Sequence, residues 1–219
     1  MLINYKRCSE LMNCLYGRKA TKVYHIGAHI GEEAKDYYDN GVTDVCWFEA
    51  NSDIIPKLQA SINTIDMKQT IVPYALWNKN EKIQLNISSN LQSSSIFEFD
   101  KHQEYYPDIV YTDSVEMNAF RLDSLIDIQD SPLPFSDFDF INIDTQGAEF
   151  AILEGLGKHI NNVSLCGIYL EVNREHLYKN IPLINEIDEY LNSNGFVRIQ
   201  TVWTNAGWGD ALYIRKIEQ

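Results

Sequence analysis

The sequence lacks long hydrophobic runs and is poor in basic residues. In its first stretch, MLINYKRCSELMNCLYGRK, polar residues interrupt each apolar segment before it reaches the length of a signal-peptide core or a membrane span. Lys and Arg number 18 against 31 Asp and Glu, a formal net charge of −13. Such a charge repels phosphate backbones and anionic lipid surfaces. We therefore expect no membrane span, no nucleic-acid partner and a cytoplasmic location.

Cysteine is scarce and unclustered, and no glycine- or proline-rich linker or internal repeat divides the chain. The cysteines are Cys8, Cys14, Cys46 and Cys166. They form no CxxC pair, so we expect reduced thiols and no zinc site. We expect one domain at 23–219, preceded by a helical extension at 1–22.

Apolar runs alternate with helical patterns along most of the chain. The predicted strands are 23–26, 45–48, 70–74, 81–87, 115–120, 138–143, 164–172, 196–203 and 211–217. The predicted helices are 9–16, 31–40, 52–62, 122–126, 148–156 and 183–193, the first with Ser9 as N-cap and Gly17 as its stop. Strands that alternate with helices indicate an α/β fold built on a parallel sheet.

One stretch, 88–114, shows no sustained period and is rich in Ser, Asp and Tyr. A loop of that length inside a compact domain is more often functional than idle. We expect it to contact the substrate, with Ser94 and Ser95 as candidate contacts.

The segment VYHIGAHIGEE, 23–33, predicts a nucleotide-binding corner: a strand, a turn with Gly27 and Gly31, and a helix start with free N–H groups. Glu49 ends the next predicted strand and follows Gly31 by 18 residues, close to the spacing at which an acidic residue meets a ribose diol. No GxxxxGK[ST] motif is present, and two glutamates follow the turn, so a polyphosphate would be repelled. A cationic adenosyl cofactor, S-adenosylmethionine, fits this pattern.

The chain resembles the FkbM-type methyltransferases, which are class I S-adenosylmethionine-dependent O-methyltransferases. The motifs that carry the resemblance are HIGAHIGEE, CWFEAN, PYALWN, SSSIF, FRLDSL, INIDTQGAEFAILEG and YLEVNREHLY. The resemblance implies a Rossmann-like fold: a mostly parallel seven-stranded sheet with helices on both faces and an antiparallel C-terminal strand.

The resemblance also implies the cofactor-binding residues. Ala28 and His29, with the two glycines of the turn, would line the methionine side of the cofactor, and Glu49 would bind the ribose hydroxyls. Ala75 and Leu76 would flank the adenine. The family's first motif usually carries Asp where this chain has His25, which leaves open how the cofactor's ammonium group is held.

Methyl transfer to a hydroxyl needs a base and a rigid alignment of oxygen, methyl and sulfur. Asp144 closes the run FDFINID at the ligand edge of the predicted sheet, and is our leading catalytic carboxylate. The alternative is that it only caps the next helix. Gln146 and Glu149 either orient a substrate or satisfy that helix end. Glu171 ends the next strand and is expected in the same crevice, where the pair could hold a divalent metal that the resemblance does not require.

We expect the acceptor to be a sugar, free or within a glycan, because FkbM-like enzymes include many carbohydrate O-methyltransferases. Aromatic residues that could pack on sugar rings are Tyr105, Tyr106, Tyr111, Trp203 and Trp208. The histidines His102, His159 and His176 are expected at the surface or on helices. Two alternatives remain: a catalytically idle cofactor-binding or partner module with the same fold, and an NAD-dependent oxidoreductase, against which the acidic turn argues. The sequence leaves the oligomeric state open.

Overall fold

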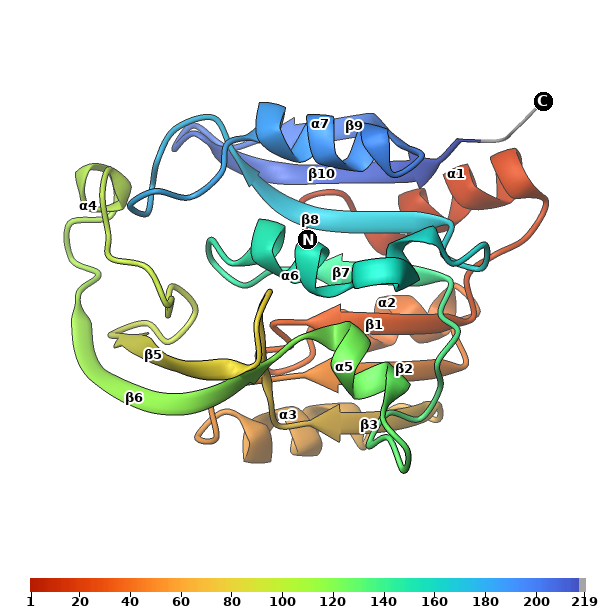
Figure 1. Cartoon of the computed structure of the whole chain (residues 1–219), viewed down its shortest axis with the longest axis horizontal. Helices are drawn as coiled ribbons and strands as arrows, with labels where there is room; N and C mark the ends of the chain where they lie inside the picture. The colour runs from red at the N-terminus through yellow and green to blue at the C-terminus, as the bar shows by residue number, and fades with distance from the viewer. Residues whose placement is uncertain (217–219) are drawn as a thin grey trace.

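The computed structural model describes residues 1–216, and its main element is a seven-stranded sheet of order β3-β2-β1-β7-β8-β10-β9 (Figure 1). The strands are β1 (Lys22–Ile26), β2 (Asp44–Phe48), β3 (Lys68–Val72), β7 (Phe140–Ile143), β8 (Gly167–Asn173), β9 (Phe196–Trp203) and β10 (Trp208–Arg215). The first five pair in parallel, whereas β10 is antiparallel to both of its neighbours. The predicted sheet with an antiparallel C-terminal strand is confirmed, although Ile217 of the predicted last strand lies outside the described residues.

Helices cover both faces of this sheet, as predicted. On one face lie α1 (Tyr5–Tyr16), α2 (Ala34–Asp39) and α3 (Ile55–Ile62); on the other lie α5 (Leu122–Asp127), α6 (Glu149–Gly155), the 3-10 helix η1 (Gly157–Asn161) and α7 (Ile184–Ser193). Alternation along the strands sorts the side chains between two cores. In β1, for example, Val23 faces the first set of helices and Tyr24 the second.

Helix α1 belongs to the core of the first face. Its buried residues Tyr5, Cys8 and Met12 pack in the same cluster as strand residues of β1, β2 and β8. The prediction of Ser9 as N-cap was wrong: the side chain of Asn4 accepts the Arg7 N–H at 2.9 Å, and Ser9 is buried inside the helix. The helix ends as predicted at Gly17, which has a positive φ of 67°.

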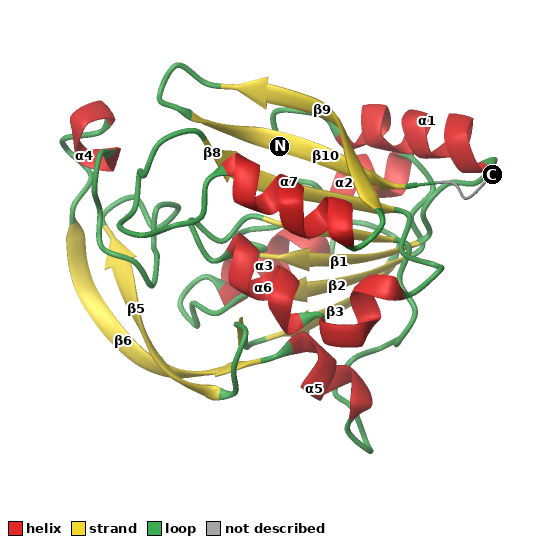
Figure 2. Ribbon diagram, turned by 45° about the horizontal axis from the view of Figure 1, so that its top comes forward, coloured by secondary structure: helices red, strands yellow, loops and turns green. Residues whose placement is uncertain are grey.

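A second sheet of three strands extends from the main one. Its order is β4-β6-β5, with β4 (Ala75–Leu76), β5 (Glu81–Ser88) and β6 (Tyr111–Phe120). Strands β5 and β6 form a curved antiparallel arm that projects beyond the main sheet (Figure 2). The stretch 88–114, predicted as a loop, carries the short helix α4 (His102–Tyr105) and the first residues of β6.

The topology positions a site between β1 and β7. Strands β1, β2 and β3 follow one another in one direction across the sheet, whereas β7 and β8 continue in the other. Ligands of open α/β sheets bind outside the carboxyl ends of the strands where the order reverses. The turns after β1, β2, β7 and β8 meet at that edge.

Candidate active site

A cavity of about 530 Å³ opens at this edge of the sheet. The turns after β1, β2 and β7 form its floor and one side. The other side comes from the segment 90–109, which connects the two strands of the arm, and from the loop after β8. Three non-glycine residues in its wall, His29, Leu91 and Gln146, have positive φ angles of 44°, 63° and 57°. Such strained backbone persists where the surrounding structure enforces it, and it gathers at functional sites.

The turn after β1 requires glycine at position 27. Gly27 has a φ of 82°, and a Cβ atom there would lie 1.8 Å from the carbonyl oxygen of Asp144. The N–H groups of Gly27 and Ala28 donate to the carbonyl of Phe48 at 3.0 and 2.9 Å. Gly27, Ala28 and His29 line the cavity.

Gly31 acts in packing. It does not line the cavity, and a Cβ there would lie 2.7 Å from the Cγ2 atom of Ile62 and 2.9 Å from a methyl group of Leu58, both on α3. The structure therefore places Gly31 where the first turn meets α3, away from the predicted ligand contact.

Glu49 lies at the carboxyl end of β2, and its side chain is fixed by the neighbouring turns. Its carboxylate accepts the N–H of His29 at 2.8 Å and the N–H of Asn51 at 2.7 Å. Burial raises the pKa of Glu49 even though these N–H groups oppose the shift. Since a carboxylate offers about four lone-pair sites, acceptor capacity remains for a ligand. Ala75 and Leu76 of β4 line the cavity as well.

His25 lines the cavity, but its side chain is 3% exposed and belongs to a buried polar network. Its Nδ1 lies 3.0 Å from the hydroxyl of Tyr37, which also accepts the side-chain amide of Asn142 at 3.0 Å, and its ring packs on Trp47. Burial lowers the pKa of His25. The imidazole is thus engaged inside the core, and its Nε2 lies 4.0 Å from a carboxylate oxygen of Glu33.

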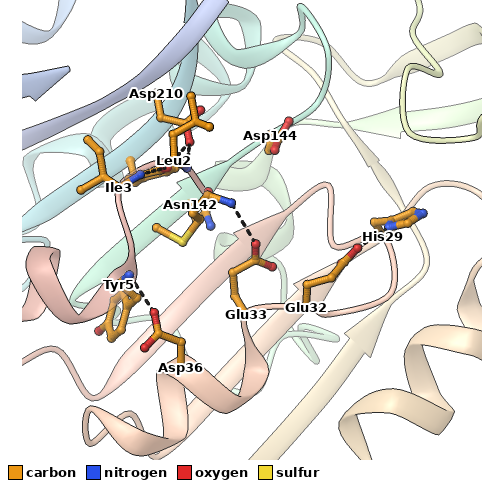
Figure 3. A network of polar contacts seen from close by, with 12 residues as sticks. Leu2, Ile3, Tyr5, His29, Glu32, Glu33, Asp36, Asn142, Asp144 and Asp210 are labelled. Atoms are coloured by element: carbon orange, nitrogen blue, oxygen red, sulfur yellow. Dashed lines mark hydrogen bonds and ion pairs between the residues drawn. The ribbon is translucent and has the colours of Figure 1, made fainter. Parts of the chain in front are cut away.

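The amino-terminal segment contacts Glu33, which lines the cavity, and Asp210, which does not (Figure 3). The α-ammonium of Met1 lies 3.4 Å from Oε1 of Glu33. The N–H of Leu2 donates to Asp210, which pairs in register with Glu171 of β8. A primary ammonium group therefore fits against Glu33 at this wall.

The turn after β7 joins two carboxylates through one amide. The Nε2 of Gln146 donates to Asp144 at 2.9 Å and to Glu171 at 3.0 Å. Its Oε1 accepts the hydroxyl of Tyr178 at 2.8 Å, and its carbonyl accepts the hydroxyl of Ser95 at 2.6 Å. The structure thus brings together Asp144, Glu171 and Gln146, the three predicted catalytic side chains. Hydrogen bonds to its side chain and to its backbone carbonyl hold Gln146 in place.

Both carboxylates are harder to ionise than ordinary ones. The surrounding protein, together with the charges of Asp210 and Glu149, raises the pKa of Asp144 to about 7, although its side chain is exposed to the cavity. Glu171 is only 5% exposed, and burial and Asp144 raise its pKa well above the usual range. A carboxylate with a pKa near neutrality is suited to accept a proton.

Two of the predicted substrate residues are engaged within the fold. The carboxylate of Glu149 accepts the N–H groups of Thr145 and Gly147 at 2.8 and 3.0 Å, and it does not line the cavity. The Ser95 side chain is fully buried on the carbonyl of Gln146. Both residues therefore shape the turn after β7, whereas Ser94 and Trp208 line the cavity.

An aromatic wall forms part of the cavity lining. It consists of His102, Tyr106, Tyr178 and Trp208, and the Nε1–H of Trp208 donates to the hydroxyl of Tyr106 at 3.1 Å. His102 lies on a helix, α4, which is one of its two predicted positions, but its side chain is buried, with only 4% of it exposed. The other aromatic candidates, Tyr105, Tyr111 and Trp203, lie outside the cavity lining.

The described residues hold no group of three or more His, Cys, Asp or Glu side chains arranged to bind a metal ion. Within residues 1–216, no helix has the length and apolar character needed to cross a membrane.

The fold is that of the class I S-adenosylmethionine-dependent methyltransferases. Residues 25–198 match the methyltransferase FkbM domain, and the chain belongs to this family. No curated protein matches the chain.

Two solved structures illustrate how far the fold is shared. The ribosomal protein L11 methylase from Lactobacillus delbrueckii subsp. bulgaricus has a TM-score of 0.53 and 14% identity, over 96% of this chain and 78% of that one. The magnesium protoporphyrin IX methyltransferase from Synechocystis PCC 6803, with bound S-adenosylmethionine, has a TM-score of 0.50 and 10% identity, over 98% and 81%. At these identities the likeness establishes the fold alone.

Proposed function

We propose that the protein is an O-methyltransferase that transfers a methyl group from S-adenosylmethionine to a hydroxyl of an uncharged, sugar-like acceptor. One observation carries the proposal. The same cavity is lined by the glycine turn and Glu49, and by a carboxylate of raised pKa and several aromatic side chains. This pairs a cofactor site with a proton acceptor.

The cavity residues fit the cofactor's chemistry. When bound, S-adenosylmethionine supplies an electrophilic methyl group on a sulfonium. Glu49 accepts the ribose hydroxyls, Ala75 and Leu76 pack against the adenine, and Gly27 to His29 approach the methionine portion. Glu33 binds the ammonium group of the cofactor, because His25 stands where the family's first motif usually carries an aspartate. The contact of the Met1 ammonium with Glu33 supports this assignment.

Asp144 accepts the proton of the acceptor hydroxyl. Its raised pKa means that a substantial fraction is ionised at neutral pH and that the proton, once taken, is held. Gln146 keeps the Asp144 carboxylate in one orientation through the 2.9 Å hydrogen bond. Glu171 accepts a hydrogen bond from the same amide group, so its carboxylate lies beside Asp144 and also binds the acceptor.

The cavity chemistry favours an uncharged acceptor. Among residues 1–216, neither Lys nor Arg lines the cavity, while several carboxylates do. The α-ammonium of Met1 lies at the cavity but is already paired with Glu33, so an acceptor that carries phosphate or carboxylate groups would find no free counter-charge among these residues. Tyr106 and Trp208 offer aromatic faces on which a sugar ring packs.

The test is incubation with methyl-labelled S-adenosylmethionine and a panel of neutral glycans, followed by mass spectrometry. We expect label on a glycan oxygen and not on phosphorylated or uronic-acid glycans. Transfer to nitrogen or carbon would contradict the proposal. Cofactor binding without transfer to any glycan would favour the idle module, and loss of activity in EDTA with recovery in Mg²⁺ would recast Asp144 and Glu171 as metal ligands.

A further inference from the structure

His102 is a buried titratable side chain of the cavity that the proposed chemistry leaves unused. It is 4% exposed, on the first residue of α4, and it lines the cavity. Its ring stacks on Phe99 with centroids 4.3 Å apart and planes 13° from parallel. Tyr106 and Tyr178 close its other sides, with ring centroids at 5.1 and 5.5 Å.

The hydrogen bonds of this imidazole are unsatisfied. The Nδ1 atom of His102 is sealed from solvent without a partner, and Nε2 makes no hydrogen bond to any residue within 1–216. Nε2 is therefore the nitrogen that is left to face the cavity. A buried polar group without a partner costs stability, and each one in a native protein calls for an explanation.

Phenylalanine would satisfy every packing contact of this position. It would keep the stack on Phe99, which continues to Tyr111 at 4.0 Å, and it would bury no orphan nitrogen. A buried residue that lowers stability and makes no compensating contact within the fold indicates a functional site. Burial also lowers the pKa of His102, so the ring is neutral at neutral pH and offers one donor and one acceptor.

We propose that His102 is an acceptor-binding residue, whose Nε2 forms a hydrogen bond with a hydroxyl of the sugar ring other than the one that is methylated. The inference rests on the proposed function and names the residue that recognises the acceptor. The aromatic wall supplies the packing surface, and His102 supplies the polar contact within it. Asp144 and Glu171, joined by Gln146, contact the reacting side of the ring.

The experiment measures binding of uncharged probes to the protein saturated with S-adenosylhomocysteine. The probes are methyl glycosides of neutral hexoses and deoxyhexoses, and their dissociation constants are measured by ligand-observed NMR. We expect His102→Phe to weaken the binding probe roughly three- to tenfold, the loss of one hydrogen bond between neutral groups. His102→Gln, which retains a polar tip, recovers part of the affinity.

Stability separates this role from a structural one. We expect His102→Phe to leave Tm unchanged or raised, with unchanged affinity for S-adenosylhomocysteine. The matched control is His159→Phe on η1: His159 Nε2 lies 3.0 Å from Asp127, so the control lowers Tm and leaves probe binding unchanged.

Each failure has its own meaning. Unchanged probe affinity in His102→Phe, or a clear loss of Tm, overturns the role of His102 while the proposed function stands. A wild-type protein that binds S-adenosylhomocysteine but no probe overturns the sugar acceptor and the inference with it. A wild-type protein that binds no S-adenosylhomocysteine overturns the proposed function itself.

Discussion

Glu49 combines a structural contact with a proposed cofactor contact. The N–H groups of His29 and Asn51 hold its carboxylate at the end of β2. Glu49→Gln keeps the shape and removes the charge, and hydrogen bonds to charged groups contribute about 1.5–3 kcal/mol. We expect about tenfold weaker binding of S-adenosylhomocysteine by calorimetry. Asp53→Asn, an exposed change in the same turn, is the control, and equal affinities for the two variants would remove Glu49 from the cofactor site.

Glu171 should make the fold less stable at alkaline pH. Its pKa is raised in the folded protein by burial and by Asp144, so the stability it contributes is present below the pKa of the unfolded chain and is lost as pH rises through the folded value. Glu171→Gln removes the titration.

We therefore expect the variant to exceed the wild type in Tm at pH 8 by more than at pH 5. Thermal unfolding at both pH values measures this difference. A constant difference between the two proteins would mean that Glu171 is not held in its uncharged form by the fold.

At this scale the sequence identified the carboxylates but not their connection. Strand-end positions placed Asp144 and Glu171 at one edge, and the structure brings them together. The hydrogen bonds by which the Gln146 amide joins the two carboxylates depend on the positive φ of Gln146, which no sequence pattern encodes. The burial of His102 was not predicted, because a four-residue helix has no apolar periodicity to reveal its buried side.

Among the elements, the β1–α2 turn has the strictest requirement. Gly27→Ala would force a Cβ to within 1.8 Å of the Asp144 carbonyl, in addition to the strain of a positive φ. Gly41→Ala is the matched control: φ is 93° there, and the nearest atom would lie at 3.9 Å.

We expect the control to lose about 1–2 kcal/mol of unfolding free energy, the cost of the backbone strain alone. Gly27→Ala should lose more and should also lose affinity for S-adenosylhomocysteine. Chemical denaturation and calorimetry measure the two effects. Similar stability and affinity in both variants would show that β1 and β7 do not approach as closely as described.

The arm formed by β5 and β6 shows why one element escaped prediction in part. Strand β6 begins four residues before the predicted 115. The sequence did not reveal this earlier start, because most residues of the strand up to Asn118 are exposed. A strand that is covered on neither face has no alternation of apolar and polar residues. In β5, by contrast, Leu85 is buried and lines the cavity with Ile83, and the alternation that predicted the strand has a physical cause.

At the scale of the whole molecule, the order of elements was predictable because burial imposes it. The central strands β1, β2, β7 and β8 are covered on both faces, so their runs are largely apolar. The crossover helices between β1, β2 and β3 leave their own helical period. Two strands of the second sheet were predicted, at 81–87 and 115–120, but the third was not, since β4 has two residues. Its place beside the cavity depends on pairing with β6, a distant segment.

The central claim is that Asp144 accepts a proton from the acceptor hydroxyl, and the most direct test is the pH dependence of methyl transfer by the wild type and by Asp144→Asn. The base must be ionised, so wild-type kcat/KM should rise with pH to a plateau, with a midpoint near the raised pKa of about 7.

Asp144→Asn should lower turnover by about 10² to 10⁴, with little change in affinity for S-adenosylhomocysteine. The pH profile of its kcat/KM should lack the midpoint near 7. Asp66→Asn, an exposed change outside the cavity, should behave as the wild type. Because asparagine caps a helix about as well as aspartate, undiminished turnover by Asp144→Asn with an unchanged pH profile would reduce Asp144 to a capping residue and contradict the account.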